Sequence, residues 1–230
     1  MNNESTYARK FNALFKKMEA PELEIPDRDA VTRMIVAFLQ WDATAKQAET
    51  AYRKLMTVMV DNNDLRVSLP YEIKEQLGSR YPKADERIER LRDSLQRVFV
   101  LEHAIETRSL EGKSKKEVRA YFDMLPGIVP YVSATVCLLT YGAHAIPVDN
   151  KLADLLKAEA VVDPDASIEE IERFIVRQIK AGDGVDGHLR LQAWVEAGSS
   201  RVHAGRTTKK KAAAKKVAKK PTKQRVTKKK

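Results

Sequence analysis

The sequence of 230 residues is poor in cysteine: Cys137 is the one thiol, and it lies inside an apolar run. A disulfide framework within the chain is therefore excluded, as is a zinc or iron–sulfur site made of cysteine ligands. The four histidines show no metal-ligand spacing, so we expect no metal and no cofactor. No apolar run approaches the roughly 20 residues that span a bilayer, and the N-terminus lacks the apolar centre of a secretory signal. These absences predict a cytoplasmic protein without membrane contact.

Acidic residues are missing from one end of the chain. Residues 206–230 contain thirteen Lys or Arg and no Asp or Glu, so the net charge of +10 less these thirteen leaves about −3 for residues 1–205. This Lys/Ala/Thr segment has almost nothing to bury, which predicts disorder. Its charge favours a polyanion, above all DNA, through counterion release. The lysines assigned to this contact are Lys209, Lys210, Lys211, Lys215, Lys216, Lys219 and Lys220. A solubilising end, or contact with RNA or an acidic membrane surface, are the alternatives.

Strand-like alternation is nearly absent from the rest of the sequence. Apolar residues recur at helical spacing instead, as in DRDAVTRMIVAFLQW, where Val31 and Phe38 lie on one stripe. The pattern predicts an all-α domain over residues 28–200. A polar N-terminal extension, residues 1–27, precedes it, and the basic tail, residues 201–230, follows it.

A tight turn at Pro126-Gly127 joins two helical patterns in EVRAYFDMLPGIVPYVSATVCLLTYG. Such a turn leaves unpaired N–H groups at the positive end of the second helix, an arrangement that suits a backbone phosphate. Gly127 would let the backbone approach a ligand where a Cβ would interfere. The alternative is an ordinary corner between two packed helices.

The order of motifs along the body resembles the endonuclease III superfamily of DNA glycosylases, which carry a helix–hairpin–helix. LPGIVPYVSATVCLLTYG, followed by AIPVDNKLADLL, is similar to the hairpin and aspartate segment of that family. Upstream, AVTRMIVAFLQWDATAKQAETAYRKL resembles the family's early helix pair, and LGSRYPKADERIERL resembles the segment before the hairpin. The resemblance covers roughly residues 28–197 and implies a two-lobed, all-α fold that binds DNA.

The resemblance assigns the phosphate contact to the hairpin, which in the family runs Leu-Pro-Gly-x-Gly. Leu125, Pro126 and Gly127 match this pattern, but Val129 stands where the second glycine would be. A β-branched residue resists positive φ, and the following Pro130 has no N–H to donate. The phosphate cradle is therefore expected to be reshaped, with at least one donor fewer.

The resemblance also locates the chemistry. Bifunctional members carry a catalytic lysine four residues after the first hairpin glycine, where this sequence has Tyr131. A phenol cannot form an imine with the sugar, so lyase chemistry by that route is not expected. Asp149 falls at the family's catalytic aspartate, which can stabilise an oxocarbenium-like sugar and help activate water; the alternative role is a helix N-cap. Lys151, where the family often has histidine, could meet a phosphate or be solvated.

The segment QWDAT resembles the loop from which family members insert a side chain into the DNA stack. Asp42 stands where a glutamine often lies, and an acid is unfavourable against phosphates. Trp41 could act as the wedge instead, or could pack in the core. Further on, Ser199 and Ser200 lie where the family has its four-cysteine loop, which implies a branch without the iron–sulfur cluster.

Three functions stay open on the sequence alone. The first is a monomeric, monofunctional glycosylase of base-excision repair that flips a damaged base, hydrolyses its N-glycosidic bond with Asp149 and holds duplex DNA with its tail. The second is a non-catalytic DNA-binding or architectural protein on the same scaffold. The third is a helical protein-interaction module whose tail contacts RNA or membranes. DNA association is common to the first two and implies a nucleoid-associated location in the cytoplasm.

Overall fold

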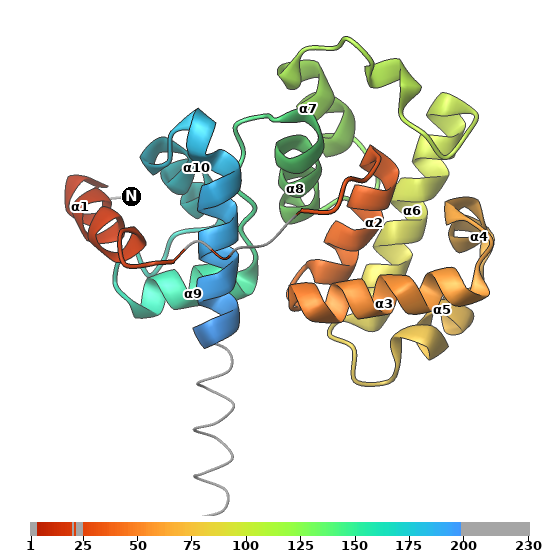
Figure 1. Cartoon of the computed structure of the whole chain (residues 1–230), viewed down its shortest axis with the longest axis horizontal. Coiled ribbons are helices and arrows are strands. Elements are labelled where there is room, and N and C mark those ends of the chain that lie inside the picture. The colour runs from red at the N-terminus through yellow and green to blue at the C-terminus, as the bar shows by residue number, and fades with distance from the viewer. Residues whose placement is uncertain (1–3, 20, 22–24, 199–230) are drawn as a thin grey trace, which may run out of the picture.

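A computed structural model describes residues 4–19, 21 and 25–198, which form two helical lobes side by side (Figure 1). No strand forms within these residues, which confirms the all-α prediction. The helices are α1 (Glu4–Phe15), α2 (Ala30–Gln40), α3 (Ala45–Val58), α4 (Asn62–Val67), α5 (Pro70–Leu77), α6 (Ala84–Glu102), α7 (Lys115–Asp123), α8 (Pro130–Tyr141), α9 (Asn150–Ala158), α10 (Ile168–Gln178) and a last helical segment at residues 184–198. The tail lysines and the two serines at 199 and 200 lie outside the described residues.

The first lobe contains α2 to α8, with α2 at its centre. α2 packs against α3, α6 and α8, and every residue from Ala30 to Leu39 is buried. The sequence AVTRMIVAFL supplies apolar side chains on nearly all faces, as a helix buried on all sides requires. Asp29 starts this helix, because its Oδ1 accepts a hydrogen bond from the N–H of Thr32 at 2.8 Å.

The second lobe brings distant parts of the chain together. α1 packs with α9, α10 and residues 184–198 around a separate apolar core. Phe11 of α1 is fully buried there, with its ring centroid 5.8 Å from that of Phe174 in an edge-on contact. Residues 1–27, which the sequence pattern sets apart as an extension, thus contribute a helix to this core.

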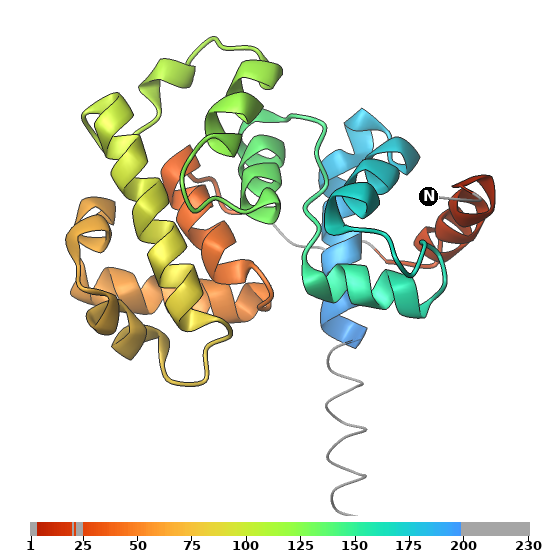
Figure 2. The ribbon, with the colours of Figure 1, turned by 180° about the vertical axis from the view of Figure 1, so that it is seen from behind.

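The border between the lobes runs along α8 and residues 142–149 in both views (Figure 1, Figure 2). α8 ends at Gly142, whose positive φ of 59° lets the chain turn away from the helix. The chain then crosses to the second lobe and begins α9 with Asp149 as its N-cap. The start of α9 therefore lies against the first lobe. No helix in the described part of the chain is both long and apolar enough to cross a membrane.

Arg87 of α6 is completely buried and holds the end of α2 in place. Its guanidinium donates to the carbonyl oxygens of Phe38, Trp41 (2.6 Å) and Pro82 (3.0 Å). The last carbonyls of a helix have no partner within the helix, and here the arginine provides one. Burial lowers the pKa of Arg87, yet a guanidinium stays charged in proteins. This contact fixes the turn between α2 and α3, which faces the second lobe.

We expect Arg87→Met to lower the free energy of unfolding by about 3 kcal/mol, because three carbonyls lose a donor while the side-chain volume is nearly kept. Urea unfolding followed by circular dichroism measures the loss. Arg80→Met, at an exposed position before α6, is the matched control and should change stability by less than about 0.5 kcal/mol. Equal stability of the two variants would contradict the role given to Arg87.

Candidate functional site

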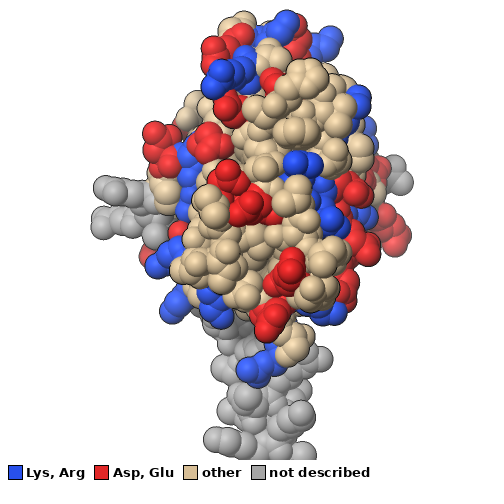
Figure 3. Space-filling model, turned by 90° about the vertical axis from the view of Figure 1, so that its right-hand side faces the viewer, with Lys and Arg blue, Asp and Glu red and all other residues tan. Residues whose placement is uncertain are grey.

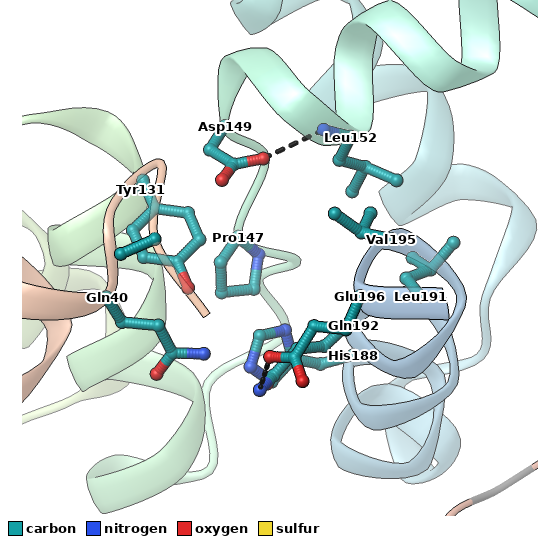
Figure 4. A pocket seen from close by; sticks show the side chains of 11 residues that line it. Gln40, Tyr131, Pro147, Asp149, Leu152, His188, Leu191, Gln192, Val195 and Glu196 are labelled. Atoms are coloured by element: carbon teal, nitrogen blue, oxygen red, sulfur yellow. Dashed lines mark hydrogen bonds between the residues drawn. The ribbon is translucent and has the colours of Figure 1, made fainter. Parts of the chain in front are cut away.

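The two lobes enclose a small cavity of about 30 Å³, which Figure 4 shows from close by. Tyr131 and Gln40 of the first lobe lie on one side, and the last helical segment lies on the other. Asp149 lies at the start of α9, with Pro147 between the two sides. A cavity of this volume holds about one or two water molecules. The remaining lining residues are Ala43, Leu152, His188, Leu191, Gln192, Val195 and Glu196.

Asp149 is 8% exposed and both of its carboxylate oxygens accept hydrogen bonds. Oδ1 accepts from the N–H of Leu152 at 2.9 Å, which caps α9, and Oδ2 accepts from the N–H of Asp42 at 3.2 Å. Burial raises the pKa of Asp149 and the charge of Asp42 adds to this; the bond from Leu152 and the charge of Lys151 oppose it. The structure thus brings Asp149, Lys151 and Asp42 together, and Asp149 is the N-cap of α9.

Asp42 turns inward and caps the same helix from the other lobe. Its backbone has a positive φ of 54°, and its side chain is buried. Oδ1 accepts from the N–H of Asn150 at 3.1 Å and Oδ2 from Asn150 Nδ2 at 2.8 Å, while Lys83 Nζ lies 2.7 Å from Oδ2. Burial alone would raise the pKa of Asp42, but the bonds from Lys83 and Asn150 outweigh it and lower the pKa. Asp42 and Asp149 therefore form a reciprocal contact across the border, which we call the interlobe contact.

Trp41, beside the interlobe contact, packs in the core of the first lobe. It is 8% exposed, and its ring centroid lies 4.3 Å from Lys83 Nζ and 5.9 Å from the guanidinium of Arg87. This arrangement favours the packing alternative for Trp41 over that of a wedge. The turn that resembles a DNA-inserting loop is thus folded against the protein.

Tyr131 lies in the first turn of α8 and its side chain lines the cavity. Burial raises the pKa of its phenol well above the ordinary value, and the charges of Asp149 and Glu196 act in the same direction. The hydroxyl therefore stays protonated at neutral pH. It can donate a hydrogen bond into the cavity but offers no amine for imine chemistry.

The hairpin before α8 is held by α6. Gly127 has a φ of +77°, and a Cβ there would lie 2.5 Å from the carbonyl oxygen of Arg90. Glycine is therefore required by the close approach of α6, whereas the sequence had suggested the approach of a ligand. Ser94 Oγ donates to the carbonyl of Pro126 at 2.7 Å, and Leu125 is buried. Val129, the N-cap of α8, has an extended backbone with φ of −114°.

His188 and Glu196 are titratable residues of the site that the sequence patterns do not predict, and both come from the last helical segment. Glu196 Oε1 accepts from the N–H of Ala45 at 2.7 Å, so the second lobe also caps α3 of the first. His188 is 4% exposed, and burial lowers its pKa to about 4. Neither residue belongs to a recognisable motif, and their spacing marks only one face of an amphipathic helix. Among the described residues, no group of three or more His, Cys, Asp or Glu is placed to hold a metal ion.

No protein-family model matches the chain, and no curated protein sequence matches it either. Solved structures do match it. A non-covalent endonuclease III–DNA complex and a trapped endonuclease III–DNA covalent intermediate each align with a TM-score of 0.59 at 16% identity, over 84% of this chain and 85% of theirs. A thermostable thymine-DNA glycosylase aligns over the same shares with a TM-score of 0.54 at 17% identity.

A third kind of enzyme shares the arrangement of helices. The 8-oxoguanine glycosylase/lyase of Clostridium acetobutylicum, in complex with double-stranded DNA, aligns with a TM-score of 0.59 at 14% identity, over 86% of this chain and 71% of that one. The likeness at such low identity is one of fold. The resemblance read from the sequence is confirmed at that level.

The burial of His188 predicts a pH dependence of stability. In the unfolded chain this imidazole takes up a proton near pH 6.5, and in the folded protein only near pH 4. The contribution of neutral His188 to the free energy of unfolding should be fully present above pH 6.5. The free energy of unfolding should then fall by up to about 3 kcal/mol as the pH drops from 6.5 to 4. His188→Gln should flatten this part of the profile in urea unfolding measured across the pH range. His103→Asn, at an exposed histidine, should keep the wild-type profile. If the free energy of unfolding changed equally with pH in all three proteins, His188 would not be the cause.

Proposed function

We propose that this chain, which has the helix–hairpin–helix DNA glycosylase fold, binds duplex DNA and hydrolyses the N-glycosidic bond of a damaged base. The observation that carries the proposal is the position of Asp149, a desolvated carboxylate that lines the cavity between the lobes beside Tyr131. DNA-bound glycosylases of the same fold support it.

The residues of the cavity fit hydrolysis by water. In this reaction water attacks C1′ of the sugar, the bond from C1′ to the base nitrogen breaks, and the base leaves with the electron pair. The carboxylate of Asp149 would stabilise positive charge on the sugar and take the proton from water. Burial raises its pKa, which makes it a stronger base than an exposed aspartate. Tyr131 lacks an amine, so the reaction ends at the abasic site and the strand stays intact.

Contacts to the DNA backbone would come from the hairpin and from lysines. Within the described residues, neither the N–H of Gly127 nor that of Val129 donates to a protein acceptor; Gly127 is partly exposed and could donate to a phosphate oxygen, whereas Val129 is 7% exposed. Lys151 is close enough to lower the pKa of Asp149 by its charge and could meet a neighbouring phosphate. The lysines of residues 206–230 would add affinity that does not depend on sequence.

Catalysis on this scaffold requires the cavity to grow. Pockets that enclose a small-molecule ligand measure about 300 Å³ or more. This is about ten times the volume of the cavity between these lobes. The bonds from Asn150 to Asp42, from Asp42 to Asp149 and from Ala45 to Glu196 join the lobes beside the cavity and would have to break. DNA phosphates that attract Lys83 would weaken the hold of that lysine on Asp42.

A second candidate function is DNA binding without catalysis. It is favoured by one observation: both oxygens of Asp149 are engaged by backbone N–H groups, so the carboxylate serves the structure of the free protein. In that case the hairpin and the tail would bind DNA while the lobes stay closed.

A lesion-excision assay separates the two candidates. Duplexes carrying uracil, alkylated or oxidised bases are incubated with the protein, and abasic sites are then cleaved with alkali. We expect lesion-dependent breaks that fall at least about a hundredfold in Asp149→Asn, because the carboxylate that assists water is removed. Asp154→Asn, at an exposed aspartate of the same helix, should keep the activity.

Breaks that persist in Asp149→Asn would show that another group does the chemistry. The absence of breaks across the whole panel, in a protein that still binds the duplexes, would rule out the enzyme and support the second candidate.

A further inference from the structure

The surface around α4 carries an unusual share of exposed apolar side chains. Of the eight large hydrophobic residues that are exposed within the described part, five lie between residues 58 and 71: Val58, Val60, Val67, Leu69 and Tyr71. Figure 3 views the molecule from the side that carries α4 in Figure 1, and uncharged surface covers much of that side between clusters of acidic and basic residues. Apolar side chains that gather in this way mark interaction sites more often than those scattered singly.

A groove of about 330 Å³ lies between the end of α3, α4 and α5 in this region. Val58, Met59 and Val67 contribute apolar lining. Asp64, Glu72 and Glu75 also line it, and no lysine or arginine does. We call this site the acidic groove. Its occupant should combine small apolar side chains with positive charges.

We propose that the acidic groove binds the chain's own basic tail, residues 206–230, and holds it away from DNA. The tail has the complementary composition: in KKKAAAKKVAKK, residues 209–220, alanine and valine alternate with groups of lysine, and no acidic residue interrupts them. Alanine and valine side chains can pack against Val58, Met59 and Val67, and the lysines can pair with the carboxylates of the groove.

The length of the tail allows this contact. The last helical segment ends at Gly198, and the chain from there to Lys220 spans up to roughly 70 Å when extended. A folded body of this size is about 45 Å across. Lys209 lies at most roughly 40 Å from Gly198, whereas the part of the segment toward Lys220 can cross from one lobe to the other. A tethered segment has an effective concentration near 1 mM, which makes even a weak contact populated.

Release of the tail would raise the affinity for DNA. If the groove binds the tail with a dissociation constant of about 0.1 to 1 mM, half to nine tenths of the tails are docked. Duplex affinity would then rise about two- to tenfold when docking is abolished. The docking does not depend on any enzymatic activity; only this effect on affinity rests on the proposed DNA binding.

The first experiment locates the tail. Ala213→Cys introduces a thiol for a nitroxide spin label, while buried Cys137 is protected from it. In nuclear magnetic resonance spectra of the full chain at low salt, we expect the amide signals of residues 58–76 to broaden selectively. Broadening should disappear in Val67→Ser/Glu75→Lys, which changes two exposed residues of the acidic groove. It should persist in Asp165→Lys, an equal change of charge at an exposed site in the other lobe.

Two results would overturn the proposal. The first is that the signals of residues 58–76 do not broaden, or broaden no more than those of the rest of the surface. The same conclusion follows if their broadening is unchanged in Val67→Ser/Glu75→Lys. The other is broadening that arises only between molecules, seen when spin-labelled protein without isotope is mixed with isotope-labelled protein without the spin label. In that case a second copy, rather than the molecule's own tail, occupies the groove.

The second experiment measures duplex affinity of the same full-length variants at low salt. Val67→Ser/Glu75→Lys should bind about two- to tenfold more tightly than Asp165→Lys, since the charge change is equal and the tail is released in only one of them. Equal affinities would refute the competition with DNA. If no variant binds duplex, the proposed function fails, whereas the spin-label result still decides the docking.

Discussion

The interlobe contact is the constraint on which the rest of the site depends. Asp42 caps the first turn of α9 through Asn150, and Asp149 accepts the backbone N–H of Asp42 in return. Two carboxylates approach one another in a buried place, which is costly unless cations and N–H groups surround them. Lys83 compensates one of them, and the N–H of Leu152 compensates the other. The closed arrangement of the lobes is therefore stabilised by polar groups that would otherwise be unpaired.

This contact sets the structural role of Asp149 as a cap against the catalytic role that we propose for it. As a cap it needs its oxygens bound to N–H groups, and as a catalytic base it needs one of them free to face water. The turn at residues 41–44 is held in the same way, because Asp42 caps α9 and Trp41 is buried. The structure thus has the fold of the DNA-bound glycosylases, while both oxygens of Asp149 are bound to backbone N–H groups.

Much of the fold could be predicted from local patterns. Helix starts follow from capping residues such as Ser114 and Ser167, whose side chains accept hydrogen bonds from backbone N–H groups three residues on, and the hairpin follows from Pro126-Gly127. Asp149 is predicted as a cap from its place before NKLADLL, and as a site residue from the resemblance of AIPVDNKLADLL to the family's aspartate segment.

The remaining contacts join residues that are distant in sequence. Asp42 and Asn150 are 108 positions apart, and nothing in QWDAT indicates that its aspartate would turn inward with positive φ. Arg87 lies in ADERIERLR among other arginines, and only the tertiary fold distinguishes it as the buried one. His188 becomes part of the site in the same way, through packing between the lobes. Sequence patterns predict elements well, whereas pairings across a fold depend on how the elements pack.

In the function proposed above, the interlobe contact closes the site in the free protein and DNA opens it. The structure of the chain bound to a duplex with an abasic-site analogue tests this most directly. We expect that in this complex Asp42 has left Asn150, one oxygen of Asp149 faces the sugar, and the cavity holds the analogue. A complex in which the hairpin contacts DNA while Asp42, Asn150 and Asp149 keep their hydrogen bonds would contradict it.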